Sequence, residues 1–142
     1  MAITSTLTTS FKTELLAATH NFATNGNAFK LALYTSSATL GATTTAFTTT
    51  GQATGTNYTS GGAALTNIAP LSSGTVGFTD FNDLTFGTAT ITARGCMIYN
   101  DTASNDASVA TIDFGGDKTS TAGDFTIVFP AKASGTAIIR IA

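Results

Sequence analysis

Two periodicities of apolar residues divide the chain. Between residues 10 and 22, apolar side chains recur at the spacing of one helix face, at Phe11, Leu15, Ala18 and Phe22. Ser10 is a suitable N-cap, and Asn25-Gly26 supplies a stop signal. The pattern predicts one amphipathic helix over 10–22 that covers a sheet edge or a neighbouring subunit. Residues 1–9 are polar and threonine-rich, and we expect an extended arm that could lie across a neighbour.

The period changes to two after the helix. Phe29, Leu31 and Leu33 alternate with less apolar positions, which predicts a half-buried strand. Residues 35–62 form a long threonine-rich loop with few anchors. A structureless loop of this length is uncommon in a compact domain, so we expect it to be partly ordered by a short edge strand or by a neighbouring chain.

From residue 63 onward, short apolar runs alternate with turn signals at the spacing of a sandwich or barrel. We expect strands near 63–68, 75–81, 88–93, 95–100, 107–114, 124–129 and 136–141. Gly115-Gly116-Asp117 is interpreted as a hairpin turn, and 95–100 as a strand buried on both faces. The predicted fold is an all-β, antiparallel β-sandwich or jelly-roll-like domain. It is a single domain over 1–142, with its β part over 28–142 and one N-terminal amphipathic helix.

The composition favours a surface made for contact with other protein. Threonine makes up about a fifth of the chain, and charged residues only 10%, against roughly 25% in a typical soluble domain. Outward faces of threonine fit a β protein, and few charges are present to keep copies apart. The pattern indicates permanent assembly.

Charge and cysteine usage narrow the possible partners. The net charge is −2, and the six basic residues are scattered, which argues against nucleic-acid binding. No apolar stretch is long enough to cross a membrane, and the N-terminus does not resemble a signal peptide. Cys96 is the only cysteine, so a disulfide framework is excluded and folding in the cytosol fits best.

Residues that could carry chemistry have simpler structural interpretations. His20 is the only histidine and is interpreted as a helix C-terminal residue, and Cys96 as a buried apolar residue. Five aspartates in the last third fit turn positions better than a calcium site: Asp101, Asp106, Asp113, Asp117 and Asp124. We therefore expect no enzyme activity, no metal and no cofactor.

Arg94 lies in an otherwise apolar strand segment and needs a carboxylate partner there. Asp80 and Asp83 are the expected partners from the preceding strand region. The pair can be intramolecular or can join two subunits, and the sequence leaves both readings open.

Several runs of the sequence carry a resemblance. They are Phe29 to Leu40, Asn57 to Thr66, Thr90 to Asn100, Asp113 to Thr119 and Ala137 to Ala142, together with Ser10-Phe11-Lys12. Across nearly the whole chain, these resemble a family of small virion structural proteins of tailed bacteriophages. The resemblance implies a particle component, located in the virion and assembled in the host bacterial cytoplasm. It implies no catalytic residues.

The leading functional hypothesis is a capsid decoration, or cement, protein that stabilises the head by bridging capsid subunits. Its expected partners are the major capsid protein or other virion proteins, and a symmetric homo-oligomer, trimer or dimer, is expected. The candidate interface residues are Phe11, Phe22, Phe47, Tyr58 and Arg94. The alternative is a tail, neck or fibre-associated component, including one that contacts the host surface. A hydrolase using Asp80 and Asp83 is a third class, which turn geometry disfavours.

Overall fold

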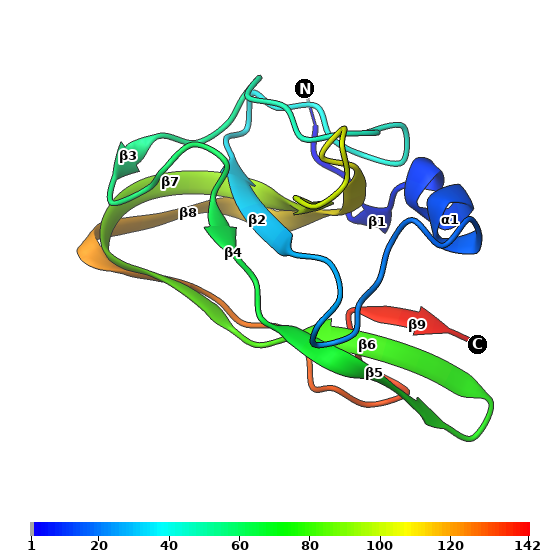
Figure 1. The fold of residues 1–142 in the computed structure, drawn as a ribbon. Helices are drawn as coiled ribbons and strands as arrows, with labels where there is room; N and C mark the ends of the chain where they lie inside the picture. The colour runs from blue at the N-terminus through cyan, green and yellow to red at the C-terminus, as the bar shows by residue number, and fades with distance from the viewer. Residues whose placement is uncertain (1) are drawn as a thin grey trace.

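The computed structural model describes residues 2–142 (Figure 1). Half of the chain is strand and 6% is helix. The elements, in chain order, are β1 (Thr6–Leu7), α1 (Thr9–Leu16), β2 (Phe29–Tyr34), β3 (Gly55–Thr56), β4 (Ala63–Ala64), β5 (Asn67–Ser73), β6 (Val76–Phe81), β7 (Leu84–Asn100), β8 (Ser108–Ile127) and β9 (Ile139–Ile141).

The strands form two sheets. The larger has the order β1-β8-β7-β2-β4, with β3 also paired to β7, and the smaller has the order β5-β6-β9. Every pairing between these strands is antiparallel. The predicted all-β, antiparallel, sandwich-like fold with one helix is therefore confirmed.

A long β7–β8 ribbon dominates the molecule, and Figure 1 shows it curving around β2 and β3. The sequence pattern predicted four short strands here and a hairpin turn at Gly115-Gly116-Asp117, which is wrong. The register passes from Ala93↔Lys118 to Gly95↔Asp113, so residues 114–117 bulge from β8 opposite Arg94. Glycine allows this bulge because Gly115 has a φ of 81°.

The helix is shorter than predicted. Thr8, rather than Ser10, is the N-cap, and its hydroxyl accepts a hydrogen bond from the Phe11 amide at 3.3 Å. The helix ends at Leu16 because Ala18 adopts a left-handed φ of 61°, and the Thr19 amide then donates to the Glu14 carbonyl. Residues 17–22 are therefore a loop.

The N-terminal arm and the threonine-rich loop pack on this chain itself. Ile3 is buried, and the Thr4 amide donates to the Leu40 carbonyl at 2.9 Å. The loop 35–62 contains β3, which pairs with β7, so the expected short strand is present. The arm is thus used within the fold, which corrects the expectation that it lies across a neighbour.

Two apolar clusters cover the two faces of β2. Phe29, Leu31 and Leu33 belong to the larger cluster between the sheets, whereas Ala32 and Tyr34 belong to a smaller one under the loop. The strand is therefore buried on both faces rather than half-buried. Its neighbour in β7, over 96–100, is also fully buried, as predicted.

Candidate functional site

Two of the five predicted interface residues are core residues. Phe11 is 1% exposed and Phe22 is 7% exposed. Their rings pack edge to face with centroids 5.9 Å apart, and Phe22 also stacks on Phe29 at 4.4 Å. Neither can reach a partner in this conformation, so the expectation that they anchor an interface is corrected. Helical spacing identified an apolar face without showing that this chain covers it.

Phe47 and Tyr58 hold the threonine-rich loop on the sheet. Phe47 is half-buried and stacks on Tyr99, with ring centroids 4.8 Å apart. The Tyr58 hydroxyl accepts from the Leu33 amide at 2.8 Å and donates to Gln52 Oε1 at 3.0 Å. Burial raises the pKa of Tyr58 to about 12. Both rings are thus used to order residues 35–62.

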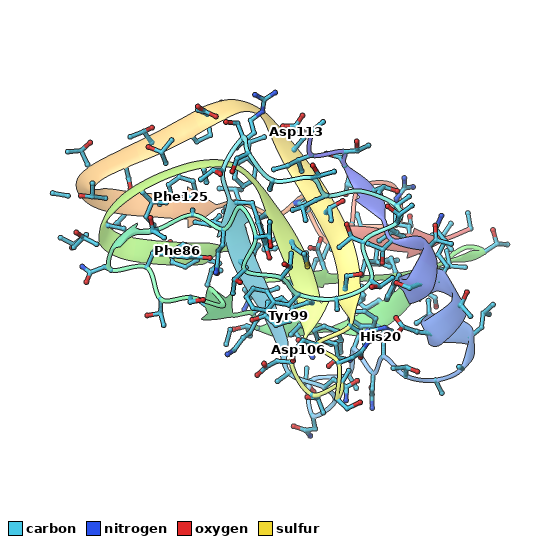
Figure 2. The ribbon with its side chains drawn as sticks, turned by 90° about the horizontal axis from the view of Figure 1, so that it is seen from above. His20, Phe86, Tyr99, Asp106, Asp113 and Phe125 are labelled. Carbon is cyan, nitrogen blue, oxygen red and sulfur yellow. The ribbon has the colours of Figure 1, made fainter. Side chains whose placement is uncertain are left out.

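Arg94 pairs across the β7–β8 ribbon. Its Nε donates to Asp113 Oδ1 at 3.0 Å, so the expected partners Asp80 and Asp83 are wrong and the pair is intramolecular. The Gly115 amide also donates to Asp113 Oδ1, at 2.9 Å. This amide and Arg94 together lower the pKa of Asp113. The pair fastens the bulge at residues 114–117, and Asp113 is labelled near the top of the view in Figure 2.

His20 sits in a buried polar network rather than at a helix end. Asn100 Oδ1 accepts from the amides of Thr102 and Ala103, so its Nδ2 must donate to His20 Nδ1, at 3.1 Å. The imidazole proton therefore lies on Nε2 and is donated to Glu14 Oε1 at 3.1 Å. A carboxylate oriented against an imidazole also occurs in catalytic relays.

Here the network has a structural use. The His20 side chain is fully buried among three phenylalanines, and both ring nitrogens bond within the chain. The network ties the loop after α1 to the β7–β8 turn. No sequence pattern indicated this network, because Glu14, His20 and Asn100 come together only in the folded chain.

An apolar groove lies between α1 with its following loop and the smaller sheet. Its volume is about 480 Å³, and Leu15, Leu71, Phe78 and Ile141 are among its lining residues. Leu71 is 49% exposed and Ile141 is 60% exposed, while Leu16, the next residue along α1, is 91% exposed. We call these five residues the groove face. Figure 1 places α1, β9 and the β5–β6 hairpin at the same end of the molecule.

Sequence reasoning missed the groove face. One signal was available, because Leu16 is apolar although it lies off the predicted apolar face of the helix. The other members come from β5, β6 and β9, and only the folded chain brings these strands beside α1.

No protein-family model, no curated protein and no solved structure matches this chain. Within residues 2–142, no group of three or more His, Cys, Asp or Glu side chains is placed to hold a metal ion. In the same part of the chain, α1 is too short to cross a membrane.

The thiol of Cys96 should be inert in the folded protein. Cys96 is fully buried in β7, and burial raises its pKa to about 12. We expect no reaction with a maleimide at pH 8 over hours, and complete reaction once the chain is unfolded in guanidinium. Mass spectrometry of the adduct measures both, and rapid labelling of the native protein would contradict this burial.

Asp80 should make stability depend on pH. Its side chain is 1% exposed, Oδ1 accepts from the Phe81 amide, and Oδ2 has no hydrogen-bond partner among residues 2–142. Burial therefore raises the pKa of Asp80 above its usual 3.8, against the effect of nearby backbone amides.

The folded state binds this proton more tightly than the unfolded chain does. The stabilisation that Asp80 contributes is therefore complete below pH 3.8, and it is lost as the pH rises and the buried carboxyl ionises. Asparagine does not ionise, so the Asp80→Asn variant does not lose stability in this way. Its Tm relative to wild type should therefore increase from pH 3 to pH 7, as measured by circular dichroism. Parallel profiles for the two proteins would show that the carboxyl is not perturbed.

Proposed function

We propose that this chain is a non-enzymatic structural component of a tailed-phage particle. Within the particle, it acts as a capsid decoration protein that stabilises the head by bridging subunits of the major capsid protein. It works as a homo-oligomer, a trimer or dimer. The resemblance of its sequence runs to phage virion structural proteins supports this role.

The groove face is the single observation that carries the proposal. Two large apolar side chains of the lining, Leu71 and Ile141, are 49% and 60% exposed, and Leu16, 91% exposed, directly follows the lining residue Leu15 along α1. Exposed patches of this kind mark interaction surfaces. Full burial of each such side chain contributes about 1.5–3 kcal/mol, so a capsid subunit seated here would gain useful affinity.

The rest of the surface suits a lattice of neighbouring copies. Outward threonines form cross-strand hydroxyl pairs on the β7–β8 ribbon, Thr85 with Thr126 and Thr92 with Thr119, each at 3.0 Å. These pairs support the ribbon without charge. With only 10% charged residues, copies on one shell repel each other little, and we expect head binding to depend only weakly on salt.

The test is binding of the recombinant chain to purified phage heads that lack it. We expect the wild-type chain to sediment with heads and to raise their melting temperature in calorimetry. Leu71→Asp and Leu16→Asp should each weaken binding at least about tenfold, since a charge replaces a buried apolar contact.

Val128→Asp is the matched control. Val128 is 73% exposed but lies outside the groove face, so this variant should bind heads as wild type does. Sedimentation of the chain with tails instead of heads would favour the tail-associated alternative. Equal binding by all three variants would show that the groove face is not the docking surface.

A further inference from the structure

A second hollow is lined mainly by β8 and the residues that follow it, and it shares no lining residue with the groove beside α1. Its volume is about 570 Å³, within the range of roughly 300–1,000 Å³ typical of small-molecule sites. Its lining is mainly apolar and includes Phe114, Phe125, Phe129 and Ile138. Figure 2 shows Phe125 and its register partner Phe86 on the two strands of the ribbon.

One lysine belongs to this hollow. Lys118 lies opposite Ala93 in the register, and Ala93 is fully buried. Ser120, two residues further along β8, is also buried, whereas Thr119 between them is exposed and pairs with Thr92 on the outside. Strand alternation starts the Lys118 side chain on the face of the sheet that carries the core, and Lys118 is itself exposed to solvent where it lines the hollow.

Lys118 has no carboxylate partner in the described chain, 2–142. The other charged residue of the lining, Asp124, is exposed and accepts a hydrogen bond from the Thr88 amide at 3.2 Å. It alternates with the buried Phe125, and its carboxylate lines the hollow from the exposed side, where the Thr88 amide already donates to it. The hollow thus offers apolar aromatic walls and, on its exposed side, one cation that has no carboxylate partner within residues 2–142.

We propose that this hollow binds a medium-chain aliphatic carboxylate, with its hydrocarbon chain against the phenylalanines and its carboxylate on Lys118. A neutral apolar molecule would gain nothing from the ammonium group, and a short acid would leave the apolar walls unfilled. An amphipathic anion matches both features, because charge-assisted hydrogen bonds and apolar burial then act together.

The first experiment is isothermal titration calorimetry of the wild-type chain with hexanoate, octanoate and decanoate below their micelle concentrations. Each added methylene that is buried should tighten binding by up to about fourfold. Decanol, which has the same chain without the charge, should bind at least about fivefold more weakly than decanoate. No binding of decanoate at millimolar concentration would overturn the proposal.

Two lysine variants separate this site from non-specific uptake. Lys118→Met should weaken decanoate binding about fivefold or more and leave decanol binding unchanged. Lys12→Met, which removes an exposed lysine of α1 far along the chain from the hollow, should bind both as wild type does. Equal losses in the two variants, or none in Lys118→Met, would overturn the assignment of the carboxylate to Lys118.

Discussion

Replacing Phe29 by alanine is expected to lower the free energy of unfolding by about 3–5 kcal/mol. Phe29 is fully buried in β2 and stacks on Phe22 with centroids 4.4 Å apart and planes 3° apart. Its ring also contacts Phe81, at 5.8 Å, and so joins the two sheets and the loop after α1. Removing it leaves a cavity where three segments meet.

Urea unfolding followed by circular dichroism measures this loss. A domain of this size has only about 5–15 kcal/mol of stability in total, so the variant should unfold at a much lower urea concentration. Leu16→Ala is the matched control, because Leu16 is 91% exposed and should cost less than about 0.5 kcal/mol. Similar losses in both variants would contradict the placement of the core.

Replacing Gly62 by alanine is the second large effect that we expect, about 3 kcal/mol or more. Gly62 has a φ of 78°, and a Cβ there would overlap the carbonyl oxygen of Leu31 in the neighbouring strand β2. Relief of that overlap must move β4 away from β2, which breaks the pairing at Ala63 and Ala64.

A substitution at Gly74 distinguishes the cost of the steric clash from the cost of the backbone conformation. Gly74 has a similar φ of 59°, in the turn between β5 and β6, but a Cβ there would meet nothing within 4 Å. Gly74→Ala should therefore cost only about 1 kcal/mol, the cost of the left-handed conformation itself. Equal unfolding free energies for the two variants would show that β4 does not lie against β2 as described.

Local patterns predicted the fold class well. Alternation over Phe29, Leu31 and Leu33 gave β2, and the end of one strand near Asn100 and the start of the next near Ala107 gave the β7–β8 turn. These signals depend on neighbours along the chain. The strand ends predicted near Gly115 and Ala122 do not occur, because residues with positive φ there produce bulges in one continuous strand instead of turns.

The candidate site could not be predicted in the same way. Phe11 and Phe22 have the spacing of one apolar helical face, but Phe22 packs on β2 and β6, and Phe11 packs on Phe22. The groove face joins Leu15 and Leu16 of α1 to residues more than fifty positions away, and only tertiary contacts create it. Whether other parts of the chain cover an apolar side chain depends on the fold, so periodicity along the sequence does not predict it.

The measurement that tests the central proposal most directly is immunogold electron microscopy of intact phage particles, with antibody raised to the recombinant chain. A capsid decoration protein predicts gold spread over the head surface, and absent from heads stripped of the chain. Gold confined to the tail, neck or fibres would contradict the decoration role.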